Sequence, residues 1–287
     1  MSHLPFTLLA YFFNSLSVLS NKFLLSKTIP DPLIYIFYIS LFSLAAVFAL
    51  PFTIIPSASV LYLSSLSTIF WTLGAYFMFW ALKSGQISRV IPIIGTLIPL
   101  ILLIFASKTN AISPAQIWAV LILVLGMIFL NLKSLLSLSI SKKEILFEIL
   151  SAGFFAFSYI LLREAYQKSD FFSVLIWSRL ILIPLTIFIL ILPALRRKII
   201  TSHGPKLNFF SKTGLIFLGG QFSGVISELL ILFSISLANP ALVNSLQGTQ
   251  YIFLLVLARE KHTNKELLPK LAGIIAIGAG LYLLAFA

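Results

Sequence analysis

The stretch 217-FLGGQFSGVISELLILFSISLANP-240 is long and apolar enough to cross a lipid bilayer as one helix. It nevertheless holds a carboxylate, Glu228, near its middle. A charged side chain at the bilayer centre costs roughly 2.5 to 3.5 kcal/mol on insertion scales. Glu228 therefore needs a buried partner, a function, or both.

The whole chain has the composition of a membrane protein. Its 287 residues are 60% hydrophobic and 10% charged, and a soluble domain of this length could not hide so much apolar surface. The mean hydropathy is +1.07. Apolar stretches of about 20 residues, bounded by Pro, Gly, Asn or charge, predict an all-α integral membrane protein with ten transmembrane helices, at 5–26, 32–55, 60–82, 88–106, 114–132, 145–166, 171–193, 213–237, 241–258 and 267–286.

Several kinds of chemistry are absent from the sequence. Without Cys there is no disulfide, thiolate nucleophile or Cys-based metal site. His3, His203 and His262 fall in a tail or in connections and lack the spacing of a metal motif, and no phosphate-binding P-loop is found. We therefore expect no metal, no cofactor and no enzymatic activity. The N-terminus has no basic region or cleavage site and predicts a retained first helix.

The net charge is +12, and the distribution of the basic residues indicates how the chain is oriented in the membrane. Most of the 20 Lys and Arg residues lie in the odd-numbered connections, whereas the even-numbered ones hold Lys108, Arg163 and Lys168. Cytoplasmic loops of membrane proteins collect Lys and Arg. The pattern predicts a multi-pass protein of the cell (inner) membrane with both termini outside, and it explains the charge without nucleic acid as a partner.

The two halves of the chain have opposite charge patterns. The third connection contains Lys83 and Arg89 while its counterpart, the eighth, has no basic residue, and the second and seventh connections differ in the opposite sense. An ungapped alignment of 81–108 with 234–261 superposes Gly95-Thr96 on Gly248-Thr249. These features predict two inverted five-helix repeats, at 1–133 and 142–287, as in many secondary transporters.

Three motifs carry a family resemblance. They are ALKSGQISRVIPIIGTLIPL (81–100), SLANPALVNSLQGTQYIFLLVLARE (236–260) and the Gly-bearing LAGIIAIGAGLYLL (271–284). With them the chain resembles the ten-helix EamA-type branch of the drug/metabolite transporter superfamily over nearly its whole length. The resemblance implies a central cavity lined by the third, fourth, eighth and ninth helices. Glu260 matches an acidic position of the family, while Ser107 departs from it.

Glu228 has a candidate partner in Arg179, on the seventh predicted helix. At about 1.5 Å per residue, Glu228 lies roughly 13 Å and Arg179 roughly 12 Å from the outer ends of antiparallel helices. Buried ions are seldom unpaired, so the two side chains can meet. A structural ion pair and a role in substrate binding or proton coupling both remain open, and they are compatible if substrate competes for the pair.

The other acids are expected in contact with water. Glu148 lies about one turn inside the sixth predicted helix, near Lys142 and Lys143, and we expect its side chain to extend to the interface. The rest occupy helix ends or connections, where we expect solvation: Asp31, Glu144, Glu164, Asp170, Glu260 and Glu266.

Polar and helix-weakening residues define further candidates for substrate binding. Gly220 and Gly224 precede Glu228 at four-residue steps, which indicates either a cavity wall or a close helix crossing. Other candidates lie on one face of the ninth predicted helix and on the fourth, where Gln247 is either a ligand contact or an interhelical hydrogen-bonding residue: Asn244, Gln247, Gly248 and Tyr251, with Pro92, Gly95, Thr96 and Pro99.

Three more side chains lie at mid-depth in the first and third predicted helices. Trp71 and Tyr76 are too deep for an interfacial aromatic belt, and each can either pack against neighbours or stack on a planar or cationic ligand. Asn14 is expected either to pack between helices or to line a cavity.

Together these patterns predict a secondary transporter, in the exporting direction common in the family. Its substrate would be a small polar or amphipathic metabolite such as an amino acid, with membrane lipid as the other partner and a monomer or weak homodimer as the assembly. A lipid-carrier flippase of the same superfamily is the nearer alternative. A membrane enzyme acting on lipid-linked substrates is disfavoured because the acids are dispersed and the His residues lie in connections.

Overall fold

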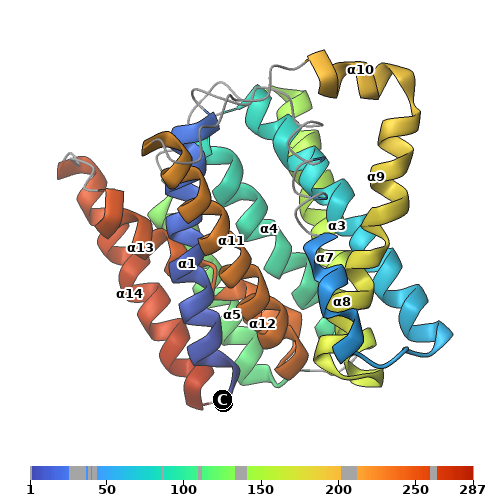
Figure 1. Ribbon diagram of the computed structural model, residues 1–287. Coiled ribbons are helices and arrows are strands. Elements are labelled where there is room, and N and C mark those ends of the chain that lie inside the picture. Colours follow the sequence, from blue (N-terminus) through green and yellow to red (C-terminus); the bar gives the residue numbers. More distant parts are fainter. Residues whose placement is uncertain are drawn as a thin grey trace.

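The computed structural model describes residues 2–25, 37, 40, 44–85, 87–108, 112–132, 141–201, 212–258 and 264–286. Every regular element in these ranges is a helix (Figure 1). In chain order they are α1 (His3–Leu25), the 3-10 helix η1 (Leu44–Phe52), α3 (Ala58–Ser84), α4 (Ile87–Lys108), α5 (Pro114–Leu130), α7 (Lys142–Lys168), α8 (Phe171–Leu180), α9 (Leu182–Ile191), α10 (Pro193–Thr201), α11 (Lys212–Leu237), α12 (Pro240–Ser245), α13 (Gly248–Ala258) and α14 (Asn264–Phe286).

These helices lie on nine of the ten predicted spans. Six helical segments in the described residues are long and apolar enough to cross a membrane: Ala58–Ser84, Arg89–Ser107, Lys142–Lys168, Phe171–Phe188, Leu218–Leu237 and Leu267–Phe286. The remaining predicted span, 32–55, falls largely outside the described residues, and η1 occupies its end. The chain is thus a helical, membrane-embedded protein.

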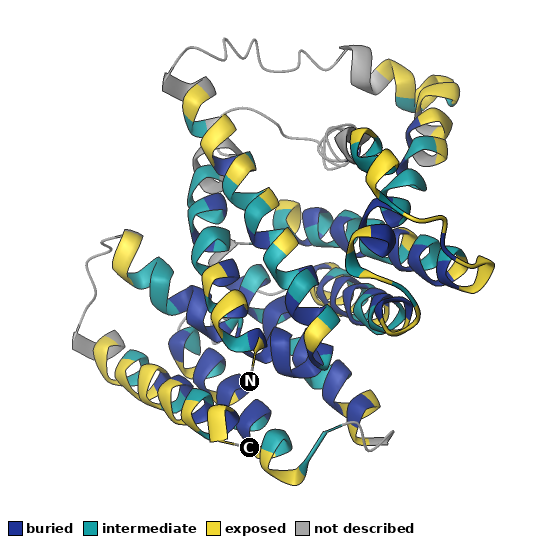
Figure 2. Ribbon diagram, turned by 60° about the horizontal axis from the view of Figure 1, so that its bottom comes forward, coloured by how far each residue is buried: buried dark blue, intermediate teal, exposed yellow. Residues whose placement is uncertain are grey.

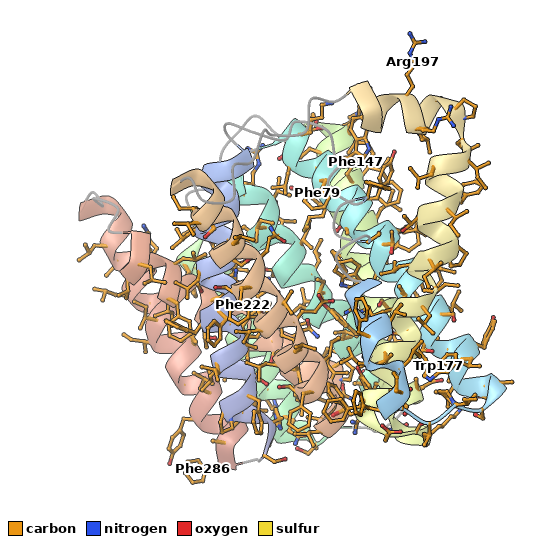
Figure 3. All side chains as sticks on the ribbon, viewed as in Figure 1. Phe79, Phe147, Trp177, Arg197, Phe222 and Phe286 are labelled. Carbon is orange, nitrogen blue, oxygen red and sulfur yellow. The ribbon has the colours of Figure 1, made fainter. Side chains whose placement is uncertain are left out.

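The outer surface fits a lipid environment. Exposed residues lie along the outward faces of the peripheral helices in Figure 2, and Figure 3 shows Phe286 at the edge of the molecule. Large apolar side chains are among the most exposed, including Phe48, Phe52, Trp118, Phe222, Leu268 and Phe286. Hydrocarbon is the medium in which such a surface is stable.

Two of the predicted spans are divided. The span 171–193 forms α8 and α9, because Pro184 lacks the N–H that would bond to the carbonyl of Leu180 and its ring crowds that carbonyl. The span 241–258 forms α12 and α13. Between them the N–H groups of Gln247 and Thr249 donate to the carbonyls of Asn244 (3.1 Å) and Leu246 (2.9 Å), in the tighter 3-10 pattern.

Three helix pairs make the most extensive contacts: α3 with α7, α1 with α11, and α5 with α14. Since α8 also packs on α3, we call α3, α7 and α8 the α7 group, and α1 with α11 the α11 group. The helices α4, α5, α12 and α13 lie between or beside them. The contact between α7 and α11 themselves is much less extensive.

The bundle has two distinct ends. Figure 2 shows both chain termini close together, at the end of the bundle opposite α10. We call these the terminal end and the α10 end. In Figure 1, α9 lies far from α11 at the α10 end, and Figure 3 shows Arg197 extending away from the bundle there.

Small residues allow the closest helix crossings. A Cβ on Gly220 would lie 2.5 Å from Cβ of Ser20, and one on Gly224 would lie 2.9 Å from Oγ of Ser17. The glycine stripe of α11 therefore packs against α1, as expected for a close helix crossing. Within the α7 group, the hydroxyl of Ser67 donates to the carbonyl of Ser158 at 2.9 Å.

The crossing of α5 and α14 brings two backbones together. A Cβ on Gly273 would lie 2.9 Å from the carbonyl oxygen of Gly126, whereas a Cβ on Gly278, on the same helix, meets nothing within 4 Å. Only the first position is closed to a side chain.

We predict that Gly273→Ala destabilises the protein by about 1–3 kcal/mol, because α5 and α14 must separate to accept the methyl group. The matched control Gly278→Ala should leave stability unchanged or raise it by up to about 1 kcal/mol through helix propensity. Thermal unfolding of purified protein in detergent measures both. Equal effects of the two substitutions would contradict this packing.

Asp170 caps α8 at the terminal end. Its Oδ1 accepts from the backbone N–H of Ser173 at 2.9 Å, and the hydroxyl of Ser173 accepts from the N–H of Ile54 at 3.0 Å. Burial opposes ionisation of Asp170, but the hydrogen bonds from the backbone and side chain of Ser173 and from nearby backbone N–H groups outweigh it and lower the pKa of this carboxyl.

We predict that Asp170→Ala costs about 0.5–2 kcal/mol by removing the cap. Because its folded pKa is lowered, the ionised cap stabilises the fold above the unfolded pKa of about 3.9, and this contribution is lost as pH falls through the folded value. In Asp170→Ser, which caps without titrating, stability should fall less on acidification below about pH 4. Acid unfolding curves that are identical for wild type and Asp170→Ser would refute this.

Candidate functional site

Arg179 of α8 and Glu228 of α11 meet in the structure. Nη2 of Arg179 donates to Oε1 of Glu228 at 2.5 Å. The side chain of Arg179 is 13% exposed and that of Glu228 is 34% exposed. The pair thus links the α7 group to the α11 group at mid-depth, and it is only partly covered by protein.

The aromatic surroundings of Arg179 come from α3 and α7. Cζ of Arg179 lies 6.0 Å from the ring centroid of Trp71, within cation–π range. The Trp71 ring packs edge-on against Phe155, with 6.1 Å between centroids. Tyr159 and Tyr166 of α7 lie close enough to interact electrostatically with Glu228. Arg179 is therefore held by a carboxylate and an aromatic face, either of which can bind another cation.

A second polar group lies where α4 faces the break between α12 and α13. A Cβ on Gly95 would be 2.8 Å from Nε2 of Gln247 and 2.8 Å from the hydroxyl of Tyr251, so the missing side chain lets both groups approach α4. Buried hydroxyls of Thr96 and Tyr251 have no hydrogen-bond partner among the described residues. Buried polar atoms are normally satisfied, which marks this group as a place for a polar ligand atom.

Tyr11 connects the two polar groups. Its hydroxyl, on α1, donates to the carbonyl of Val243 at 3.3 Å. It lies within electrostatic range of both Tyr159 and Tyr251. Three tyrosines from α1, α7 and α13 thus occupy the region between the ion pair and Gln247.

The other predicted site residues have partners inside the protein. Nδ2 of Asn14 donates to Oε1 of Gln250 at 3.1 Å, and Nδ2 of Asn244 donates to the carbonyl of Pro240 in its own helix at 2.9 Å. Tyr76 packs on the Phe77 and Trp80 rings. Asn14, Asn244 and Tyr76 are thus each held by contacts within the protein.

The expectation for Glu144 and Glu148 is wrong. Both residues are 1% exposed. Nε and Nη2 of Arg89 bind Oε1 of Glu144 at 2.9 and 2.6 Å. Glu144 fits because Gly85 has no side chain: a Cβ there would lie 2.0 Å from Oε1. Neither carboxylate reaches water as a residue near a helix end was expected to.

The terminal end is closed across the two helix groups. Nη1 of Arg163 on α7 donates to the carbonyls of Ile235 (2.8 Å) and Ser236 (2.5 Å) in the last turn of α11. The Phe233 ring of α11 meets the Phe171 ring of α8 edge-on, with 5.3 Å between centroids. A buried apolar cluster there contains residues of α3, α7, α8, α11 and α12. A second buried cluster, formed by α3, α4 and α7 with Ala241 of α12, includes no residue of α1 or α11 among the described residues.

Metal binding has no candidate site in the described ranges, where no three His, Asp or Glu side chains gather as they would around an ion.

Comparison with known proteins bears on the fold. No family model matches the sequence, and no curated protein matches it. A protein with a solved crystal structure is similar at a TM-score of 0.67 with 14% sequence identity, over 98% of this chain and 96% of that chain. At this identity the likeness shows the fold alone.

The ion pair can be tested by a double-mutant cycle. We predict that the stability losses caused by Arg179→Met alone and by Glu228→Gln alone add up to more than the loss in the double variant. The difference, the coupling free energy, should be about 0.5–3 kcal/mol. Leaving either charge unpaired at this depth has a large cost. The exposed Glu164→Gln serves as a control. Additive effects of the two substitutions would exclude a stabilising pair.

Proposed function

We propose that this protein is a secondary transporter of the EamA type, which moves a small polar or amphipathic metabolite, such as an amino acid, through a central cavity. The observation that carries the proposal is the partly exposed pair of Arg179 and Glu228, which links two helix groups at mid-depth. Because neither side chain is fully covered by protein, a ligand can reach the pair and compete for it.

The packing of helices supports two inverted repeats, at 1–133 and 142–287. If the halves correspond, α3 matches α11 and α7 matches α1, so the contact of α3 with α7 exchanges with that of α11 with α1. In the same correspondence α5 matches α14 and α4 matches α12, so the contacts of α5 with α14 and of α4 with α12 are unchanged by the exchange. The observed helix pairs follow this exchange, as expected for ten spans arranged in inverted repeats.

The two ends of the bundle support alternating access. Chain termini at one end agree with an even number of spans, and the basic connections predict that the α10 end is cytoplasmic. At the terminal end the helix groups are joined by Arg163 and Phe233. We infer a state closed to the outside, from which rocking of the α11 group against the α7 group exposes the site to the other face.

The substrate would compete with the ion pair. An ammonium group can replace Arg179 beside Glu228 and Trp71, while a substrate carboxylate can bind the released guanidinium. Gln247 and the unpartnered hydroxyls of Thr96 and Tyr251 supply further hydrogen bonds. In this proposal the protein needs no cofactor and catalyses no covalent step, works as a monomer or weak homodimer in membrane lipid, and exports its substrate from the cell.

The test is flux into liposomes that contain purified protein, with a panel of amino acids and cationic drugs, with and without a pH gradient. Wild type should accelerate the flux of at least one solute. Glu228→Gln should abolish both net flux and exchange of that solute because the binding group is lost. The control Glu164→Gln, an exposed acid at the end of α7, should transport normally.

Two outcomes contradict the proposal. Unchanged flux in Glu228→Gln would make Glu228 only a structural partner of Arg179. If wild type moves none of the solutes but scrambles a fluorescent lipid-linked sugar, the flippase alternative replaces the proposed function.

A further inference from the structure

A second buried charge cluster lies near the α10 end, away from the site described above. It consists of Arg89 from the first turn of α4 and of Glu144 and Glu148 from the first two turns of α7. Arg89 is 4% exposed and each glutamate is 1% exposed. These three residues place two carboxyl groups beside one guanidinium in a site sealed from solvent.

The hydrogen bonds distinguish the two carboxyl groups. Arg89 directs Nε and Nη2 to the same oxygen of Glu144, which is the geometry of an ion pair with an ionised carboxylate. Oε1 of Glu148 is buried and, within the described part of the chain, receives no hydrogen bond. Glu148 interacts electrostatically with Glu144 and Arg89, so the nearby arginine is already engaged by the other acid.

The elements around Glu148 offer no further buried cation among the described residues. On α7 itself, Lys142 and Lys143 are exposed. On α3, Lys83 is exposed and lies over the Trp80 ring at 5.0 Å. The neighbouring hydroxyl of Ser151 donates to the carbonyl of Gly74 at 2.9 Å.

Charge balance follows from this arrangement. With Glu144 ionised and Arg89 protonated, the cluster is neutral only when Glu148 carries a proton. An ionised Glu148 would be a buried carboxylate whose Oε1 has no donor among the described residues, next to a like charge, and both features are costly. Glu228 differs because Arg179 already neutralises it one to one.

We propose that Glu148 is the proton-binding site of this protein and binds the proton whose gradient drives transport. This inference rests on the proposed transport function and adds the coupling ion to it. When the α10 end of α7 becomes hydrated, the O–H bond of the Glu148 carboxyl breaks and the proton passes to water. The remaining carboxylate shares Arg89 with Glu144, and the cluster, now of net charge −1, stays hydrated until a proton returns.

Infrared difference spectroscopy tests the site without any substrate. Purified protein in lipid nanodiscs is perfused with buffers of stepped pH, and the C=O stretching band of protonated carboxyl groups is recorded in H2O and D2O. Wild type should show a titrating band that disappears in Glu148→Gln, shifts in Glu148→Asp and persists in Glu228→Gln and Glu164→Gln. A band that is unchanged in both Glu148 variants overturns the proposal, whether or not a transported solute is known.

Flux measurements then test coupling. In liposomes, wild-type exchange of the identified solute should vary with pH, and a pH gradient should drive its accumulation. In Glu148→Gln, which mimics the protonated acid, the exchange rate should be the same at every pH and the gradient should drive no accumulation. Accumulation equal to wild type in this variant overturns coupling through Glu148. If wild type transports no solute at all, the transport function is contradicted, and the infrared result alone decides whether Glu148 binds a proton.

Discussion

The ion pair of Arg179 and Glu228 is the interaction on which this account depends. A bilayer offers no water to solvate a charge, so each of these side chains is tolerable at mid-depth because the other is there. The pair joins α8 to α11, two helices that belong to different groups in the bundle. This contact between the two groups is electrostatic, and in the proposed function a ligand with its own charges competes for it.

The remaining contacts divide the bundle into a closed and a divergent end. Apolar packing, the Phe171–Phe233 ring contact and the Arg163 hydrogen bonds join the helix groups at the terminal end. Toward the α10 end, α9 lies far from α11 (Figure 1). In the proposed transport cycle, the two helix groups pivot around this charge pair, with Gln247 and Tyr251 at the broken helix of α12 and α13 as further substrate contacts.

Much of the fold and part of the candidate site could be predicted from hydropathy and from helix-weakening residues. Apolar length located the helices that are described, and equal depth on antiparallel helices predicted that Arg179 and Glu228 can meet. The sequence missed the hydrogen bond of Gln250 to Asn14 and the central position of Tyr11, because which face of a helix meets which neighbour is set by tertiary packing. It also missed the burial of Glu144, which depends on space left by Gly85, distant in sequence. Asn14, a polar residue in an apolar helix, needs a hydrogen-bond partner on another helix, and this need was the available signal for Gln250.

The most direct test of this account is the distance between helix groups at both ends, measured by electron–electron double resonance in lipid nanodiscs. The chain has no native Cys, so spin labels can be attached to exposed positions through Ser84→Cys with Leu215→Cys at the α10 end and Gln167→Cys with Ser2→Cys at the terminal end. A transporter that pivots at Arg179 and Glu228 should shorten the first distance and lengthen the second when a transported solute is added or the pH is changed. Distances that stay fixed under both conditions, or that change in the same direction at both ends, would contradict it.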